Sequence, residues 1–336
     1  MAFKGLSGMA TCLFRSSLAP RLQAFCDSRH PRSRVGINNQ KILLYLDRFL
    51  ISELKPGQTI SREVVARWNE SMAHLSPNTR INRLSVLRQF CRYLSYFEPR
   101  TCLIHRSFSP RRTRPVPHIY SRQEVSRIMT AARQLGPPGS LRPVVAASLI
   151  GLLYSTGIRI GEALNLALKD LDLKRRVIEI REGKFRKSRY VPVSVSTARH
   201  LTKYLRHRCD AGFSTDLVAP VFLNIIGNRH GHPGFVTLFL DLLRSIGLRG
   251  PKGQPGPRIH DLRHTFAVHR LLAWYRQGAN LGAKLPLLST YLGHSTISGT
   301  EIYLQATAQL LENAGQRFHA HFNIPPATRA KRHDNA

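Results

Sequence analysis

A segment rich in proline and arginine, residues 98–118, divides the sequence into two regions that each have their own hydrophobic pattern. Its prolines are Pro99, Pro110, Pro115 and Pro117, and its arginines are Arg100, Arg106, Arg111, Arg112 and Arg114. Proline disfavours regular structure and the like charges repel one another, so this composition predicts an extended linker. With 336 residues in total, the chain is long enough for two domains with separate cores.

The region before the linker, residues 37–97, has a helical pattern. Its first apolar series recurs at helical spacing and consists of Ile42, Leu43, Leu46, Phe49 and Leu50. A second helix is predicted over residues 61–74. A third begins at Ser76, a good N-cap residue, followed by Pro77, which suits the first helical position. The region is therefore predicted to be a small all-helical domain.

The third of these helices also carries a row of arginines opposite its apolar face: Arg80, Arg83, Arg88 and Arg92. A charged helix face is in most cases simply solvated. The strong positive charge of the whole chain favours contact with a DNA backbone instead. We therefore predict DNA binding by these four residues together with three arginines of the linker, Arg111, Arg112 and Arg114.

The region after the linker, residues 119–323, is predicted to be mainly helical with a small antiparallel sheet. Ser121 and Glu124 form a capping-box pattern, and residues 143–156 are apolar on nearly all sides, which indicates a buried helix. Gly157 then permits a left-handed helix end. Two strands are predicted at residues 177–180 and 189–193, joined by a turn. The further predicted helices cover residues 195–208, 234–246, 261–276, 286–292 and 299–318.

The charge of the chain indicates a polyanionic partner. Lys and Arg number 51 against 19 Asp and Glu, a formal net charge of +32. Nucleic acid is the leading candidate, whereas a membrane is disfavoured because no apolar run approaches the roughly 18 residues of a spanning helix. A generic RNA-binding role is supported only by the positive charge of the chain. Residues 1–36 and 324–336 are predicted to be a disordered basic arm and a disordered tail.

The five cysteines include no C-x-x-C pair and are odd in number, which argues against a disulfide framework or a zinc module and fits a reducing compartment. His260 and His264 have the spacing of a metal-binding pair. They lack the glutamate of H-E-x-x-H and an evident third ligand, so no metal is predicted.

Most of the remaining polar residues of interest fall in three sequence motifs that are informative when taken together. They are T-G-I-R-I-G-E-A-L at 156–164, H-D-L-R-H-T-F-A at 260–267, and L-G-H-S at 292–295 followed by I-Y at 302–303. Each alone is only suggestive; Tyr303 by itself would usually be a packing residue. Together and in this order they resemble the catalytic boxes of the tyrosine recombinases, the phage integrase family that includes the Xer resolvases. The resemblance is strong over residues 119–320 and weak over 37–97, where the family carries a helical core-binding domain.

The resemblance implies a role for each matching residue. Arg159 and Arg263 would clamp the scissile phosphate, for which guanidinium forks are well suited. His260 would act as a base or phosphate ligand, and His294 would donate to a non-bridging oxygen. Tyr303 would be the nucleophile. Lys184 would protonate the departing 5′-oxygen, with Lys187 as the alternative because both lie in the same predicted turn. Glu162 and Asp261 would orient the arginine and the histidine.

The function predicted is that of a site-specific recombinase or integrase, whose two domains form a clamp on double-stranded DNA. The resemblance implies a 3′-phosphotyrosine intermediate without a metal, ATP or another cofactor. It also implies a homo- or hetero-tetramer with related recombinases on DNA, in the nucleoid of a bacterial cytoplasm. Two alternatives remain at this stage: relaxation of DNA in the manner of a type IB topoisomerase, and a catalytically inactive DNA-binding accessory protein.

Overall fold

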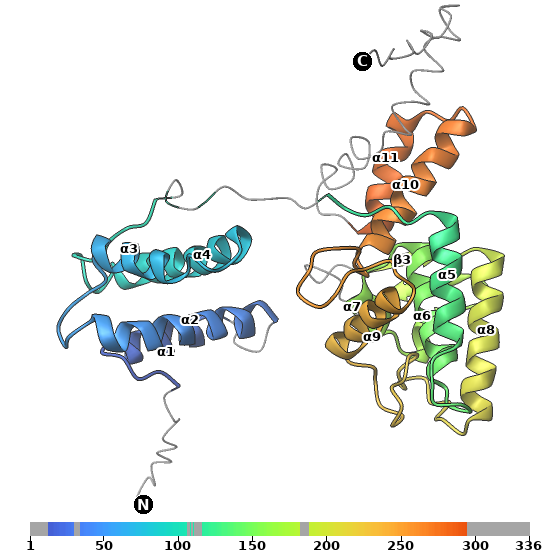
Figure 1. The fold of residues 1–336 in the computed structure, drawn as a ribbon, viewed down its shortest axis with the longest axis horizontal. Coiled ribbons are helices and arrows are strands. Elements are labelled where there is room, and N and C mark those ends of the chain that lie inside the picture. Colours follow the sequence, from blue (N-terminus) through green and yellow to red (C-terminus); the bar gives the residue numbers. More distant parts are fainter. Residues whose placement is uncertain are drawn as a thin grey trace, which may run out of the picture. The chain divides into compact units, whose positions relative to one another are not determined.

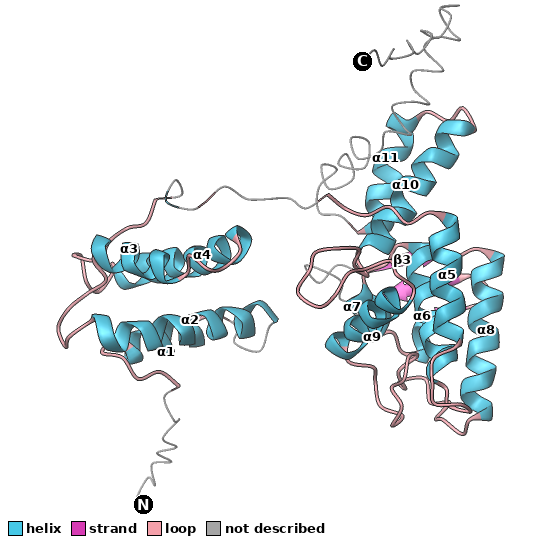
Figure 2. Ribbon diagram, viewed as in Figure 1, coloured by secondary structure: helices cyan, strands magenta, loops and turns pink. Residues whose placement is uncertain are grey.

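The computed structural model describes residues 13–29, 34–105, 108, 110, 116–181 and 188–293. The chain divides into two compact units, Met1–Pro115 and Val116–Ala336 (Figure 1). In the part of the chain that is described, almost all of the regular structure is helical, and Figure 2 shows a small sheet among the helices of the second unit. The predicted fold class, mainly helical with a small antiparallel sheet, is confirmed.

The first unit consists of helices packed around one hydrophobic core. They are α1 (Ala19–Asp27), α2 (Arg34–Glu53), α3 (Arg62–Ser71) and α4 (Pro77–Leu94). The predicted start of α4 is confirmed, because the Ser76 hydroxyl accepts a hydrogen bond from the backbone N–H of Thr79 at 3.3 Å and Pro77 is the first helical residue. The α3 helix is shorter than predicted and ends at Ser71.

The predicted disordered arm is wrong for residues 13–29. Phe14, Leu18, Leu22 and Phe25 recur at helical spacing and are buried in the core, where α1 packs against α2 and α4. The composition of this segment is basic overall, but these four apolar side chains suffice to dock a short helix. Residues 1–12 lie outside the described residues.

A buried carboxylate fastens the start of this segment to the core. Asp47 of α2 is only 3% exposed, and its two oxygens accept hydrogen bonds from the backbone N–H groups of Arg15 at 2.8 Å and Ser16 at 2.9 Å. Burial of a charge is costly unless it is hydrogen-bonded, and here both oxygens have donors.

The arginines of α4 are largely engaged within the first unit. Arg80 donates to Asn69 at 2.9 Å, and the guanidinium of Arg83 lies 4.4 Å from the ring centroid of Tyr45. Arg88 donates to the backbone carbonyls of Ile104 at 3.1 Å and His105 at 3.4 Å. Arg92 is exposed. The α4 row is therefore less uniform than the sequence suggested, and its contact with DNA stays a prediction. Arg111, Arg112 and Arg114 lie outside the described residues.

In the second unit, α6 (Arg142–Thr156) is the central helix. It packs against α5 (Arg122–Arg133), α8 (Val195–Asp210) and α10 (Asp261–Arg276) (Figure 1). Buried residues lie on all its sides, as predicted. The capping box of Ser121 and Glu124 at the start of α5 is present. The remaining helices described here are α7 (Ile160–Asn165), α9 (His232–Ser245), α11 (Leu281–Leu292) and the short 3₁₀ helix η2 (Leu168–Asp170).

The sheet has three antiparallel strands in the order β1 (Leu171–Asp172), β2 (Val177–Ile180) and β3 (Arg189–Pro192). The last two were predicted, whereas β1 has only two residues and carries no periodic signal. Pairing of Ile178 with Val191 and of Ile180 with Arg189 fixes the register of the hairpin. That register places Arg189 at the start of β3. Most of the predicted turn, residues 182–187, lies outside the described residues.

Helix α11 begins at Leu281, five residues before the predicted start. The side chain of Asn280 caps it by accepting from the backbone N–H of Ala283 at 3.2 Å, and Pro286 lies inside the helix rather than at its start. The predicted helix over 299–318 lies outside the described residues. None of the helices in the described part of the chain combines the length and hydrophobicity that a membrane-spanning segment requires.

The Asp47 contacts yield a stability prediction. Asp47→Asn places an amide NH₂ opposite a backbone N–H that needs an acceptor, so the free energy of unfolding of the first unit should fall by about 1–3 kcal/mol. Fluorescence of the buried Trp68 during urea unfolding, followed in a Trp274→Phe background, reports this unit. The matched change Asp27→Asn, at an exposed residue, should shift stability by no more than about 0.5 kcal/mol. Equal effects of both changes would contradict the anchoring role of Asp47.

Candidate active site

The end of α6 places Arg159. The hydroxyl of Thr156 donates to the carbonyl of Leu152 at 2.6 Å, and Gly157 then ends the helix in the left-handed conformation with φ of 64°. A Cβ atom at Gly157 would lie 2.5 Å from Cδ1 of Phe266, so both the backbone conformation and the close packing require glycine. Two residues later, Arg159 takes the N-cap position of α7.

Glu162 orients Arg159, as the sequence predicted. One carboxylate oxygen accepts from Nη1 of Arg159 at 2.8 Å, and the other accepts from the backbone N–H of the same residue at 3.0 Å. The second terminal nitrogen of Arg159, Nη2, donates to the carbonyl of Gly293 at 2.9 Å. Arg159 is thereby held at both ends of its guanidinium group.

The start of α10 carries the second motif. Asp261 is fully buried and accepts from the backbone N–H of Arg258 at 2.8 Å and from the Arg258 guanidinium at 3.2 Å. These contacts of Asp261 organise the turn that leads into α10. The expected orientation of His260 by Asp261 stays a prediction.

Arg263 is 3% exposed and bridges two helix ends. Its Nη1 donates to the carbonyl of Gly157 at 2.8 Å, and its Nη2 donates to the carbonyl of Leu292 at 2.7 Å. A buried guanidinium keeps its charge, since its pKa far exceeds any working pH. The end of α6 and the end of α11 are thus joined by one permanently charged side chain.

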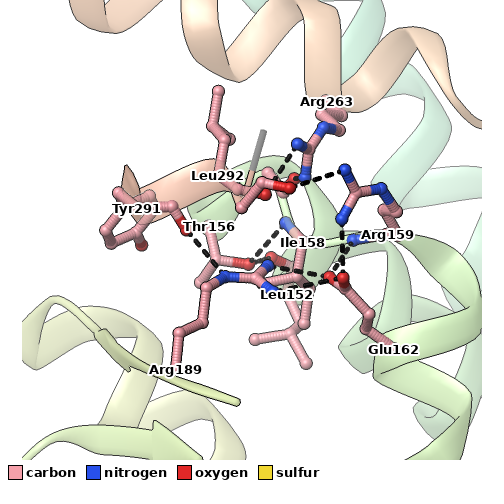
Figure 3. A network of polar contacts seen from close by, with 11 residues as sticks. Leu152, Thr156, Ile158, Arg159, Glu162, Arg189, Arg263, Tyr291 and Leu292 are labelled. Atoms are coloured by element: carbon pink, nitrogen blue, oxygen red, sulfur yellow. Dashed lines mark hydrogen bonds and ion pairs between the residues drawn. The ribbon is translucent and has the colours of Figure 1, made fainter. Parts of the chain in front are cut away.

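Three arginines meet at the end of α11 (Figure 3). The carbonyls of Tyr291, Leu292 and Gly293 accept from three different residues: Arg189 at 2.9 Å, Arg263 at 2.7 Å and Arg159 at 2.9 Å, respectively. Unpaired carbonyls give a helix C-terminus partial negative charge, so cations stabilise it. This contact fixes the chain immediately before His294. His294, Tyr303, Lys184 and Lys187 themselves lie outside the described residues.

Glu162 is the one carboxylate bonded to this arginine cluster in the described residues. Burial by itself would raise the pKa of Glu162, but hydrogen bonds and positive charge from Arg189 and Arg159 lower that pKa to about 2. A lowered pKa stabilises the fold above the ordinary carboxyl value of about 4.3, and this contribution is lost as the pH falls towards about 2. Near neutral pH, three guanidinium charges against one carboxylate leave an excess of positive charge at the site.

His260 precedes α10 and lies beside His264, with ring centroids 4.9 Å apart and ring planes at 87°. Although part of His260 is exposed, the pKa of its ring is lowered by partial desolvation, and next by the positive charges of His264 and Arg263. The ring is therefore neutral near pH 7, as an acceptor of a proton must be. Among the described residues, no group of three or more His, Cys, Asp or Glu side chains is arranged to hold a metal.

Arg189 was missed in the sequence. It stands at the start of a predicted strand, where an arginine has no unusual significance, and its partners are 27 and 102 residues away in the chain. The only available signal was an arginine two positions before Val191, the buried residue of the strand, and that signal is weak.

The pattern that describes the phage integrase family matches residues 119–309, more than half of the chain. The protein belongs to the phage integrase family. Its members are the tyrosine recombinases, so the chain is a tyrosine-type site-specific recombinase, as its three motifs predicted.

Relatives agree with this assignment. The "Putative integrase/recombinase y4rE" of Sinorhizobium fredii is 40% identical over 241 residues, which cover 71% of this chain and 76% of that protein. Tyrosine recombinase XerC of Oceanobacillus iheyensis is 30% identical over 256 residues, covering 74% and 77%.

Solved structures share the fold. XerH recombinase, solved after cleavage of palindromic difH DNA, aligns with a TM-score of 0.66 at 21% identity and covers 90% of this chain and 85% of that chain. A lambda integrase dimer bound to a COC′ core site aligns with a TM-score of 0.64 at 15% identity, covering 87% and 95%. At these identities the likeness concerns the fold, and it places the helices and the small sheet of this recombinase in a known arrangement.

The packing at Gly157 yields a second prediction. Gly157→Ala adds a left-handed backbone cost of about 1–2 kcal/mol and forces a methyl group into Phe266, so the total loss of stability should exceed about 2 kcal/mol. Gly212→Ala is the matched control, because Gly212 has φ of +78° but a Cβ there would have no neighbour within 4 Å. Chemical denaturation of both variants measures the difference. A loss no larger at Gly157 than at Gly212 would show that the contact with Phe266 is easily relieved.

Proposed function

We propose that this recombinase cleaves and rejoins DNA at specific sites through a 3′-phosphotyrosine bond at Tyr303. The observation that supports the proposal best is the joint anchoring of Arg159 and Arg263 on the end of α11, from which the chain continues to His294 and Tyr303. Two guanidinium groups held in one place can bind the non-bridging oxygens of a single phosphate. As in other phosphoryl transfers, they stabilise the charge of the transition state.

The proposed cleavage step balances as follows. The phenolic oxygen of Tyr303 attacks the phosphorus and forms the 3′-phosphotyrosine ester, while the bond from phosphorus to the 5′-oxygen breaks. The neutral ring of His260 accepts the phenolic proton, and Lys184 or Lys187 protonates the departing 5′-oxygen. The ester replaces one phosphodiester bond by another, so attack by a 5′-hydroxyl reverses the step without ATP or a metal.

Double-stranded DNA is the proposed partner. The net charge of +32 supports it, as does the presence of DNA in the solved structures of XerH and of the Tn1549 transposon integrase. Arg92 on α4 and the linker arginines are the proposed backbone contacts. Such binding should weaken steeply with salt. The logarithm of the binding constant should fall against the logarithm of the salt concentration with a slope of about −0.9 for each neutralised phosphate. Acting on chromosomal DNA, the enzyme would work in the nucleoid of a bacterial cell.

A tetramer on DNA is the proposed assembly, formed by this chain alone or with related recombinases. An apolar pocket of about 300 Å³ lies beside α10 and α11 and is lined by Phe266, Trp274, Leu288 and Tyr291, among others. It offers an acceptor for the predicted amphipathic helix over 299–318 of a neighbouring protomer, whose apolar residues include Leu304, Leu310, Leu311 and Phe318.

Trapping of the covalent intermediate tests the nucleophile. The substrate is a nicked duplex made from the DNA that flanks the gene. Wild-type protein should accumulate a covalent adduct on it, because the short strand released by cleavage diffuses away and cannot be rejoined. Being covalent, this adduct should resist detergent. Tyr303→Phe should bind the duplex equally but form no adduct, since it lacks the attacking oxygen. Tyr96→Phe, at an exposed tyrosine of the first unit, should react like wild type. An undiminished adduct from Tyr303→Phe would exclude this nucleophile.

A sulfur-substituted substrate distinguishes the two lysines. Replacing the acid by Lys184→Ala or Lys187→Ala should slow cleavage by about 10²–10⁴-fold with an ordinary 5′-oxygen leaving group. A duplex with sulfur at the 5′-bridging position should restore the rate, because a thiol with a pKa of about 8.5 departs without protonation. The lysine whose loss is rescued is the acid. If the sulfur substrate rescues neither variant, neither residue has this role.

A further inference from the structure

Arg189 makes a two-pronged ion pair inside the candidate active site. Its Nη1 donates to one oxygen of Glu162 at 3.1 Å, and its Nη2 donates to the other oxygen at 2.8 Å. The Arg189 side chain is 13% exposed and the Glu162 side chain 7%. Parallel guanidinium–carboxylate bonds of this kind are both strong and directionally specific. The predicted role of Glu162 towards Arg159 thus involves a third residue.

A further contact joins Arg189 to the end of α11. Its Nε donates to the carbonyl of Tyr291 at 2.9 Å, so all three nitrogens of the guanidinium group are used. The same group lies flat against Gly293, where a Cβ atom would come within 2.9 Å of Cζ of Arg189. Gly293 itself has φ of 69°, which favours glycine. Arg189 therefore connects β3, α7 and the end of α11 in one set of contacts (Figure 3).

The division of hydrogen bonds around Glu162 has an electrostatic consequence. Arg189 uses both carboxylate oxygens, whereas the Arg159 side chain contributes a single hydrogen bond to Glu162 and directs its other terminal nitrogen to Gly293. The charge of Glu162 is thus compensated mainly by Arg189. The positive charge of Arg159 is therefore only partly compensated by Glu162, and a phosphate can pair with it.

We propose that Arg189 is a positioning residue for strand cleavage: it pairs with Glu162 and the end of α11, and so keeps Arg159 correctly placed for the scissile phosphate. Arg189 acts through Glu162 and the carbonyl of Tyr291 and has no contact with DNA in this role. The inference rests on the proposed phosphotyrosine chemistry, in which Arg159 binds the phosphate.

Two substitutions separate the charge of Arg189 from its geometry. Arg189→Gln removes both, and single-turnover cleavage of the nicked duplex should fall by about 10–100-fold, the usual effect of losing a residue that orients a ligand at an active site. Arg189→Lys keeps the charge but cannot serve both Glu162 oxygens and the Tyr291 carbonyl at once, so its rate should fall between those of Arg189→Gln and wild type. Binding of the duplex should change little in both.

The pH profile provides a readout that a merely structural residue would not alter. Among the described residues, Arg189 and Arg159 are the charged groups that face Glu162. Loss of Arg189 removes the larger of the two influences that lower the pKa of Glu162. In Arg189→Gln, the fall in cleavage rate that accompanies protonation of Glu162 should therefore occur at higher pH than in wild type. The double variant Arg189→Gln, Glu162→Gln should lack that fall, because the amide does not titrate.

Arg181→Gln is the matched control. Arg181 directly follows β2 in the same hairpin and pairs with Asp170 at 2.7 Å and Glu179 at 2.6 Å, so the same charge is removed from the same sheet without touching Glu162. Its cleavage rate should stay within about twofold of wild type, as expected for an ion pair near the surface. Thermal unfolding of all variants is measured in parallel.

The outcomes separate this inference from the proposed function. If the wild type forms an adduct while Arg189→Gln cleaves at the rate of Arg181→Gln with an unchanged pH profile, the role of Arg189 is refuted and the recombinase chemistry stands. If the wild type forms no adduct, the proposed chemistry itself fails. Should Arg189→Gln unfold, Arg189→Lys decides: a folded variant with full activity refutes the positioning role, and a folded variant with reduced cleavage and intact DNA binding supports it.

Discussion

The contact on which the active site depends is the binding of three guanidinium groups to three successive carbonyls at the end of α11. Arg189, Arg263 and Arg159 each take one of them, at distances of 2.7–2.9 Å. These arginines come from the start of β3, from α10 and from the N-cap of α7, which are distant in sequence. A helix C-terminus normally disfavours anions, because its unpaired carbonyls carry partial negative charge. Here the arginines pair with those carbonyls and bring surplus positive charge to the same place.

Close packing makes this arrangement possible. The left-handed glycines Gly157 and Gly293 stand at the ends of α6 and α11, and at both positions a Cβ atom would meet another side chain within 3 Å. Their backbones can therefore approach the arginines and Phe266 closely. Helix α6 is buried on all sides and packs against α5, α8 and α10, so the position of its end at Gly157 is fixed by these three helices. This close packing explains how the long arginine side chains keep a defined geometry.

Local signals in the sequence were sufficient for most of the fold. The Ser76 and Ser121 caps, the apolar run of α6 and the left-handed end at Gly157 depend on neighbouring residues, and each was predicted correctly. Errors arose where local composition opposed packing. The basic residues around α1 concealed four apolar side chains, and the helix predicted to start at residue 286 begins at Leu281, where Asn280 supplies the cap. Within the site, Arg159 and Arg263 were found through the motifs. Arg189 could be recognised only in the structure, because its partners are distant in sequence and are brought to it by folding.

The anchoring of α11 at one end has a consequence for its other end. A helix of 12 residues is about 18 Å long at about 1.5 Å per residue, so the connection from Gln277 to Asn280 lies well away from the arginines. Because the arginines hold the last carbonyls, the length of that connection has no direct influence on the register of the site. The tip between α10 and α11 is thus the natural attachment point for a fluorescent reporter or an inserted peptide tag, with which the arrival of DNA could be followed without altering the chemistry.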